Sequence, residues 1–143
     1  MRFVLDTSAM VASIRSDRGA SRRLLEAALR GQGVTLLASV PLLIEYEAVM
    51  TRPEHLNAAG LTAAEVGSLL DAVAAVAERV RLAFLWRPLL PDLDDDMVLE
   101  TAANGRAVGI VTFNRRGFVL ATQQFGITVL SPAEALSRLE KEQ

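Results

Sequence analysis

Short apolar runs alternate with helix-like segments along the whole chain, and this alternation restricts the fold more than any other feature of the sequence. Buried-strand candidates lie at residues 3–5, 34–38, 80–85, 109–113 and 127–130. Between them, apolar residues recur at helical spacing, and Gly or Pro marks many segment ends. Apolar strands separated by helices predict a three-layer α/β sandwich. Its central, mostly parallel sheet should have about four or five strands, with helices on both faces.

Polar residues at segment starts predict where several helices begin. Thr7 or Ser8 is expected to cap the helix that follows the first strand, and Ser39 is expected to cap the helix that follows the second. Residues 62–65 and 131–134 each match a capping box, in which the first and last side chains satisfy each other's backbone amides.

Length and composition favour one globular domain over residues 1–143, with 51% hydrophobic residues and a net charge of −2. No run reaches the roughly 18 apolar residues of a membrane helix, and no signal peptide is visible. The absence of cysteine fits a reducing compartment, so we expect a cytoplasmic protein. Lys141 is the only lysine. The arginine bias suits phosphate contacts, but a GC-rich genome is the favoured explanation of it.

An acidic run precedes one apolar helical segment. Asp92, Asp94, Asp95 and Asp96 place four carboxylates in five residues. Charges this dense repel one another, and a folded domain holding them usually needs cations nearby. Helix capping and the helix dipole account for one or two acids, not four. Asp96 adjoins the apolar segment and is the first choice for a site residue; Asp92 and Asp95 are second choices, and Asp94 is expected in solvent.

Two further acids stand in apolar surroundings far from this run. Asp6 ends the first strand, and Glu45 lies in the apolar segment 41–46. Parallel α/β sheets bind ligands beyond the carboxyl ends of their strands, where the strand order reverses. Asp6 lies at such an end, and Glu45 and Asp96 would start or line helices that follow such ends. We therefore expect the three acids to converge on a pocket for a hard divalent metal ion.

The same segments resemble the PIN-domain family and, within it, the VapC-type ribonuclease toxins. The resemblance covers residues 2 to about 136. It rests on the order and spacing of residues 4–11, 39–47, 86–100 and 110–118. It implies metal-dependent endonucleolytic cleavage of RNA, with Mg²⁺ or Mn²⁺ as cofactor. It also implies a toxin of a toxin–antitoxin system that pairs as a homodimer and binds a small antitoxin protein.

The resemblance also assigns roles to individual residues. The catalytic acids map onto Asp6, Glu45 and Asp96, with Asp95 and Asp92 as further metal ligands. Many family members carry a fourth acid where this chain has Gly117, which leaves open whether one metal ion binds or two. The candidates for substrate contact are Thr7, Thr112, Asn114, Arg115 and Arg116.

Several alternatives stay open. Arg115 and Arg116 are equally well explained as solvated turn residues. A non-catalytic PIN-like protein that binds nucleic acid or a partner through a vestigial pocket is the second functional hypothesis. A phosphorylated receiver domain is disfavoured, because such domains need a lysine at a late strand end and Lys141 is not at one. Which RNA would be cut is not encoded in any visible base-reading motif.

Overall fold

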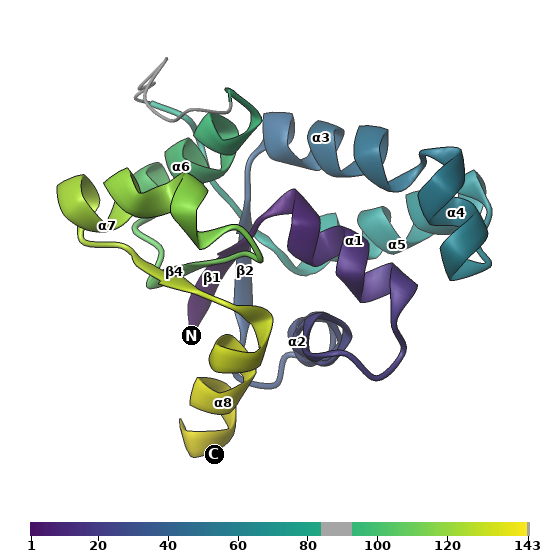
Figure 1. Ribbon diagram of the computed structural model, residues 1–143, viewed down its shortest axis with the longest axis horizontal. Coiled ribbons are helices and arrows are strands. Elements are labelled where there is room, and N and C mark those ends of the chain that lie inside the picture. Colours follow the sequence, from purple (N-terminus) through teal and green to yellow (C-terminus); the bar gives the residue numbers. More distant parts are fainter. Residues whose placement is uncertain (84–92, 143) are drawn as a thin grey trace.

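The computed structural model describes residues 1–83 and 93–142, and a parallel sheet forms its centre (Figure 1). Within these residues the sheet has five strands in the order β3-β2-β1-β4-β5, and every pairing is parallel. The strands are β1 (Arg2–Leu5), β2 (Thr35–Ala38), β3 (Glu78–Arg79), β4 (Gly109–Val111) and β5 (Thr128–Leu130). The predicted strand number and direction are therefore confirmed.

Helices cover both faces of the sheet. Figure 1 shows α6 and α7 on one side and α1 and α2 on the other, which confirms the three-layer arrangement. The helical elements are α1 (Thr7–Arg15), α2 (Ala20–Leu29), α3 (Val40–Met50), α4 (Pro53–Ala59), α5 (Ala63–Val76), α6 (Leu93–Gly105), the 3₁₀ turn η1 (Arg115–Phe118), α7 (Val119–Phe125) and α8 (Pro132–Glu142).

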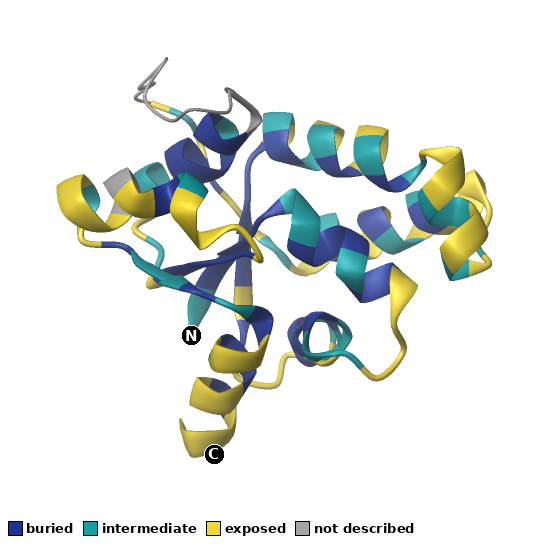
Figure 2. Cartoon of the chain, viewed as in Figure 1, coloured by how far each residue is buried: buried dark blue, intermediate teal, exposed yellow. Residues whose placement is uncertain are grey.

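The strand order reverses between β1 and β4, which pair side by side. Val4 lies opposite Ile110, and Leu5 lies opposite Val111. All four are buried, as expected for strands covered on both faces, and the buried residues gather at the centre of the fold (Figure 2). The two residues that follow these strands, Asp6 and Thr112, therefore emerge together at the reversal point, where ligands bind in such sheets.

Some helix starts agree with the sequence and one does not. Ser39 caps α3, and the capping boxes at 62–65 and 131–134 are both formed. The expectation that Thr7 or Ser8 caps α1 is wrong: Asp6 is the cap, and its carboxylate accepts the amide of Thr7. An aspartate directly after a strand is a good acceptor for the first exposed helical amides, so it displaces the weaker hydroxyl caps.

Several element boundaries also differ from expectation. Strand β4 ends at Val111, two residues before the expected end at 113. The third strand is β3 at Glu78–Arg79, earlier than the expected 80–85, because β3 pairs with the last two residues of β2; residues 84–85 lie outside the described part. Helix α6 already begins at Leu93. Asp94, Asp95 and Asp96 thus form its first turn, where the helix dipole favours acids.

No single helix in the described ranges has both the length and the apolar character to cross a membrane. Helices α4 and α5 meet those two criteria only when taken together, and they are bent by 86° at the break between them.

Candidate functional site

Asp6 is the centre of the candidate site. Its amide donates to the carbonyl of Val111 at 2.9 Å, which fixes it between β1 and β4. The carboxylate is 6% exposed and accepts three hydrogen bonds: from the amide of Thr7 at 2.7 Å, and from the hydroxyls of Ser8 at 3.0 Å and Thr112 at 2.7 Å. All three donors are neutral. Within the described residues, no arginine or lysine forms an ion pair with this buried charge.

The turn after β4 is tied to Asp6 through Thr112. The Thr112 side chain is fully buried; its hydroxyl donates to Asp6 and accepts the amide of Asn114 at 2.9 Å. Asn114 then caps η1, because its Oδ1 accepts the amide of Gly117 at 3.3 Å. This chain of bonds holds the end of β4 and the start of η1 in one orientation relative to the acid.

Gly117 lies where α6 meets this turn. A Cβ atom at position 117 would stand 2.8 Å from Oδ2 of Asp95 and 2.7 Å from Nδ2 of Asn114. Both distances are shorter than real Cβ contacts, so the missing side chain leaves the space that these two polar groups use. Asp95 therefore reaches η1 from the first turn of α6 and lies beside Asn114.

Helix α6 carries further buried acids. Asp96 and Glu100 are fully buried and stand one helical turn apart, and α6 packs against β1, β2, β4 and η1. Glu100 was not among the residues that we expected at the site. The signal that could have identified it is an acid four residues after Asp96 in an otherwise apolar helical segment. With Asp6 and Asp95, this part of the fold contains four buried carboxylates.

Helix α3 approaches Asp6 through Tyr46. The Tyr46 hydroxyl donates to the carbonyl of Leu5, the residue before Asp6. Burial raises the pKa of Tyr46 above its ordinary value, and the negative charge of Asp6 raises it further. Tyr46 therefore stays a neutral donor beside the site. Its neighbour Glu45 is half-buried on the same helix, which packs against both α1 and α6.

The remaining predicted residues lie in different settings. Thr7 contributes its backbone amide to Asp6. Arg115 forms an ion pair with Glu134 at the start of α8, whereas Arg116 is exposed and forms no ion pair within the described part. Asp92 lies outside the described residues, and so does the side chain of Asp94. The substrate-binding roles of these residues stay predictions.

The donor chemistry of the site suits a hard divalent cation. Carboxylate, hydroxyl and amide oxygens are the ligands that Mg²⁺ and Mn²⁺ prefer. In residues 1–83 and 93–142, no group of three or more acidic or histidine side chains is already arranged around one ion position. The convergence of Asp6, Glu45 and Asp96 on a single ion therefore stays a prediction.

Comparison with known proteins places most of the chain in one family. Residues 2–116 match the family described as PIN domain. The matched stretch runs from β1 into η1, so it contains Asp6, Glu45, Thr112 and every acid of α6. No curated protein matches the chain significantly.

Proposed function

Because the chain belongs to the PIN-domain family, whose members are generally metal-dependent nucleases, we propose that it is an endoribonuclease that uses Mg²⁺ or Mn²⁺. The observation that carries this proposal is the setting of Asp6. Its buried carboxylate lies at the strand-order reversal, and within the described residues it accepts hydrogen bonds from neutral donors only. Burying a negative charge without a cation is costly, so the site favours a bound cation.

In the proposed mechanism the acids hold the ion. Asp6, Glu45, Asp95 and Asp96 would supply carboxylate ligands from β1, α3 and α6, with Asp92 as a further ligand. A divalent ion in this place supplies activation of a water molecule and charge neutralisation at the scissile phosphate. Ion binding would draw together carboxylates that repel one another in its absence.

Other side chains would orient the acids and the RNA. Thr112 fixes one oxygen of Asp6, so the carboxylate keeps its direction. Asn114 lies on the same turn and can present its amide to a phosphate oxygen. Arg116 is exposed at the adjoining η1 and is suited to a neighbouring phosphate. Arg115 would first have to leave its ion pair with Glu134.

Replacing single acids tests the mechanism. Asp6→Asn retains a good helix cap, so the fold should persist, and Asp96→Asn is nearly isosteric. We expect each variant to lose at least about 100-fold in Mn²⁺-stimulated RNA cleavage. The melting temperature in EDTA should stay the same or rise slightly, because repulsion is relieved.

The matched control is Asp71→Asn, which changes an exposed acid of α5. It should cut RNA like the wild type. Undiminished cleavage by both site variants would contradict the metal mechanism. RNA binding by a wild-type chain that cuts no RNA in a defined set, with or without EDTA, would favour the non-catalytic alternative.

We also propose that the chain is a cytoplasmic toxin whose small antitoxin blocks the acidic site. An arginine or lysine side chain would pair with the acids and displace the metal ion. A basic segment that folds on binding could cover a wide surface at some entropic cost. The test is co-expression with the adjacent open reading frame. If that product neither co-purifies nor protects cells, the toxin proposal fails while the nuclease proposal stands.

A homodimer is the oligomer that we propose. Val40 and Ile44 stand one turn apart on α3 and are 51% and 64% exposed, which makes an apolar stripe suited to a two-fold contact. Ile44→Asp should produce a monomer in light scattering. Val108→Asp, at an exposed valine outside this stripe, should not. A wild-type monomer at high micromolar concentration would contradict the dimer.

A further inference from the structure

An exposed aromatic ring stands next to the acidic site. Phe113 is 61% exposed, although it lies between Thr112 and Asn114, which belong to the hydrogen-bond chain of Asp6. Its amide points to the hydroxyl of Ser8 at 3.4 Å, and that hydroxyl also donates to Asp6. The backbone of Phe113 is therefore held directly at the site while its ring faces outward.

A cavity of about 290 Å³ adjoins this ring. Helix α1 contributes Ala12 and Ser16 to its wall, the start of α2 contributes residues 19–21, and the start of α8 contributes residues 131–133. Small side chains line most of it, so Phe113 is its one large aromatic wall. Ala12 is six residues beyond Asp6, or about 9 Å along α1. The cavity thus begins within one or two nucleotides of the acid.

One serine of the cavity wall, Ser21, carries a hydroxyl that makes no hydrogen bond within the described residues. Ser21 is 3% exposed, and its Oγ has no partner there. By contrast, the equally buried Ser13 donates to the carbonyl of Met10 at 2.6 Å. A buried hydroxyl without a partner is unfavourable. The Ser21 Oγ is itself buried, but the residue forms part of the cavity wall, so a change of its side-chain rotamer would turn the hydroxyl towards a polar ligand and give it a hydrogen bond.

We propose that this cavity binds one nucleobase of the RNA substrate, next to the bond that is cut. The base would stack on Phe113 and receive or donate a hydrogen bond at its edge through Ser21. An aromatic face combined with a single polar group matches how proteins bind unpaired bases. An aliphatic side chain of a protein partner would leave the Ser21 hydroxyl without a bond. The inference rests on the proposed ribonuclease function and adds a position at which the base matters.

The test measures binding separately from cleavage. Asp6→Asn serves as the cleavage-deficient background, and the probe is a short fluorescent single-stranded RNA centred on the main cut that the wild type makes in a mixed-sequence RNA. In a series of further probes, each RNA lacks the base at one position and keeps all the others. We expect one position beside the cut at which base removal weakens binding about 5- to 150-fold. Adding Phe113→Ala should weaken binding of the intact probe by a similar factor. In that variant, removal of the same base should have no further effect on binding.

Three further variants keep the result interpretable. Phe113→Tyr should retain the effect of the missing base, and Ser21→Ala should change the preference among the four bases at that position. Val119→Ala, at another exposed apolar residue, should change neither. The inference is overturned if, in Phe113→Ala, removal of each base weakens binding as much as it does without this substitution, while the wild type still cuts RNA. It is also overturned if Phe113→Ala weakens only the binding of a protein partner. A wild type that neither cuts nor binds RNA overturns both proposals.

Discussion

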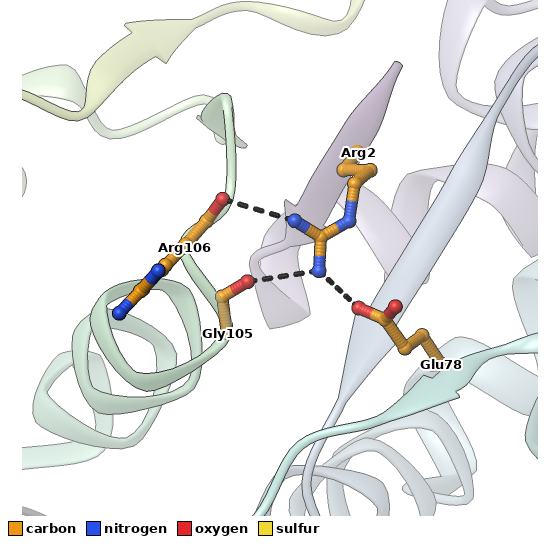
Figure 3. Close-up of polar contacts among 4 residues, drawn as sticks. All are labelled: Arg2, Glu78, Gly105 and Arg106. Atoms are coloured by element: carbon orange, nitrogen blue, oxygen red, sulfur yellow. Dashed lines mark hydrogen bonds and ion pairs between the residues drawn. The ribbon is translucent and has the colours of Figure 1, made fainter.

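The two ends of strand β1 carry opposite charges that the fold treats in different ways. At the amino end, the Arg2 guanidinium donates to the carbonyls of Gly105 at 2.9 Å and Arg106 at 3.3 Å and pairs with Glu78 (Figure 3). At the carboxyl end, Asp6 is held by neutral donors in the part of the chain that the structure describes. The charge of Arg2 is thus neutralised by Glu78, whereas the described residues orient the charge of Asp6 and do not neutralise it.

Helix α6 explains why the two ends differ. Arg2 binds the carbonyl of Gly105, the last residue of this helix, and that of Arg106, which follows it, and so closes the carboxyl end of α6. The opposite end of α6 brings Asp95 against η1. The Arg2 end of β1 and α6 thus stabilises the fold, whereas carboxylates lie at the Asp6 end. Substitutions at the two ends should accordingly separate stability from activity.

Among the substitutions that compare the two ends, the largest effect is expected from Thr112→Val. The buried hydroxyl is lost without a change of shape, so Asp6 loses one of its three donors and the amide of Asn114 loses its acceptor. Removing such an orienting group should lower cleavage about 10- to 100-fold. Thr112→Ser keeps the hydroxyl and should retain most of the activity. Equal activity of the valine and serine variants in an RNA cleavage assay would show that the orientation of Asp6 is unimportant.

Arg2→Ala should have the reverse profile. The last carbonyls of α6 lose their donor, and we expect a loss of about 1–2 kcal/mol in the free energy of unfolding. The change is measured by denaturant titration. Cleavage well below the melting temperature should stay within about twofold of the wild type. Arg2→Lys keeps the charge but not the forked geometry, so its free energy of unfolding should lie between those of the wild type and Arg2→Ala. A selective loss of activity in Arg2→Ala would contradict the division between the two ends.

The sequence predicted the sheet well because its signals are local. Residues 3–5 are apolar and buried on both faces, and the capping boxes at 62–65 and 131–134 depend only on side chains three residues apart. Asp6 could be placed at the reversal of strand order from topology alone. The sequence ranks Asp96 above Asp95 because Asp96 adjoins the apolar segment, and distance along the chain does not show that Asp95 faces η1.

The parts that could not be predicted depend on contacts between distant segments. Tyr46 reaches the carbonyl of Leu5 from another helix, and in the sequence it is only one member of an apolar run. The Phe113 ring reads as part of a strand, but β4 ends at Val111 and leaves the ring outside. The space that Asp95 uses beside Gly117 likewise exists only once α6 has packed on the sheet.

Gly117→Ala should affect stability less than Arg2→Ala does, and it tests the contact at which α6 meets the site. Gly117 does not have a positive φ, so the backbone accepts alanine and the penalty is steric. Moving Asp95 and Asn114 aside costs about 1–3 kcal/mol, and the lower entropy of the unfolded alanine chain offsets about 0.4–1 kcal/mol of it. We therefore expect about 1 kcal/mol of destabilisation with a loss of several-fold in cleavage.

The control for this substitution is Gly67→Ala, at a glycine in open space on α5. It should instead stabilise the protein by up to about 1 kcal/mol and leave cleavage unchanged. In an Asp95→Ala background one of the two close contacts is gone, so Gly117→Ala should cost less. An undiminished cost there would place the contact on Asn114 alone and remove Asp95 from the site.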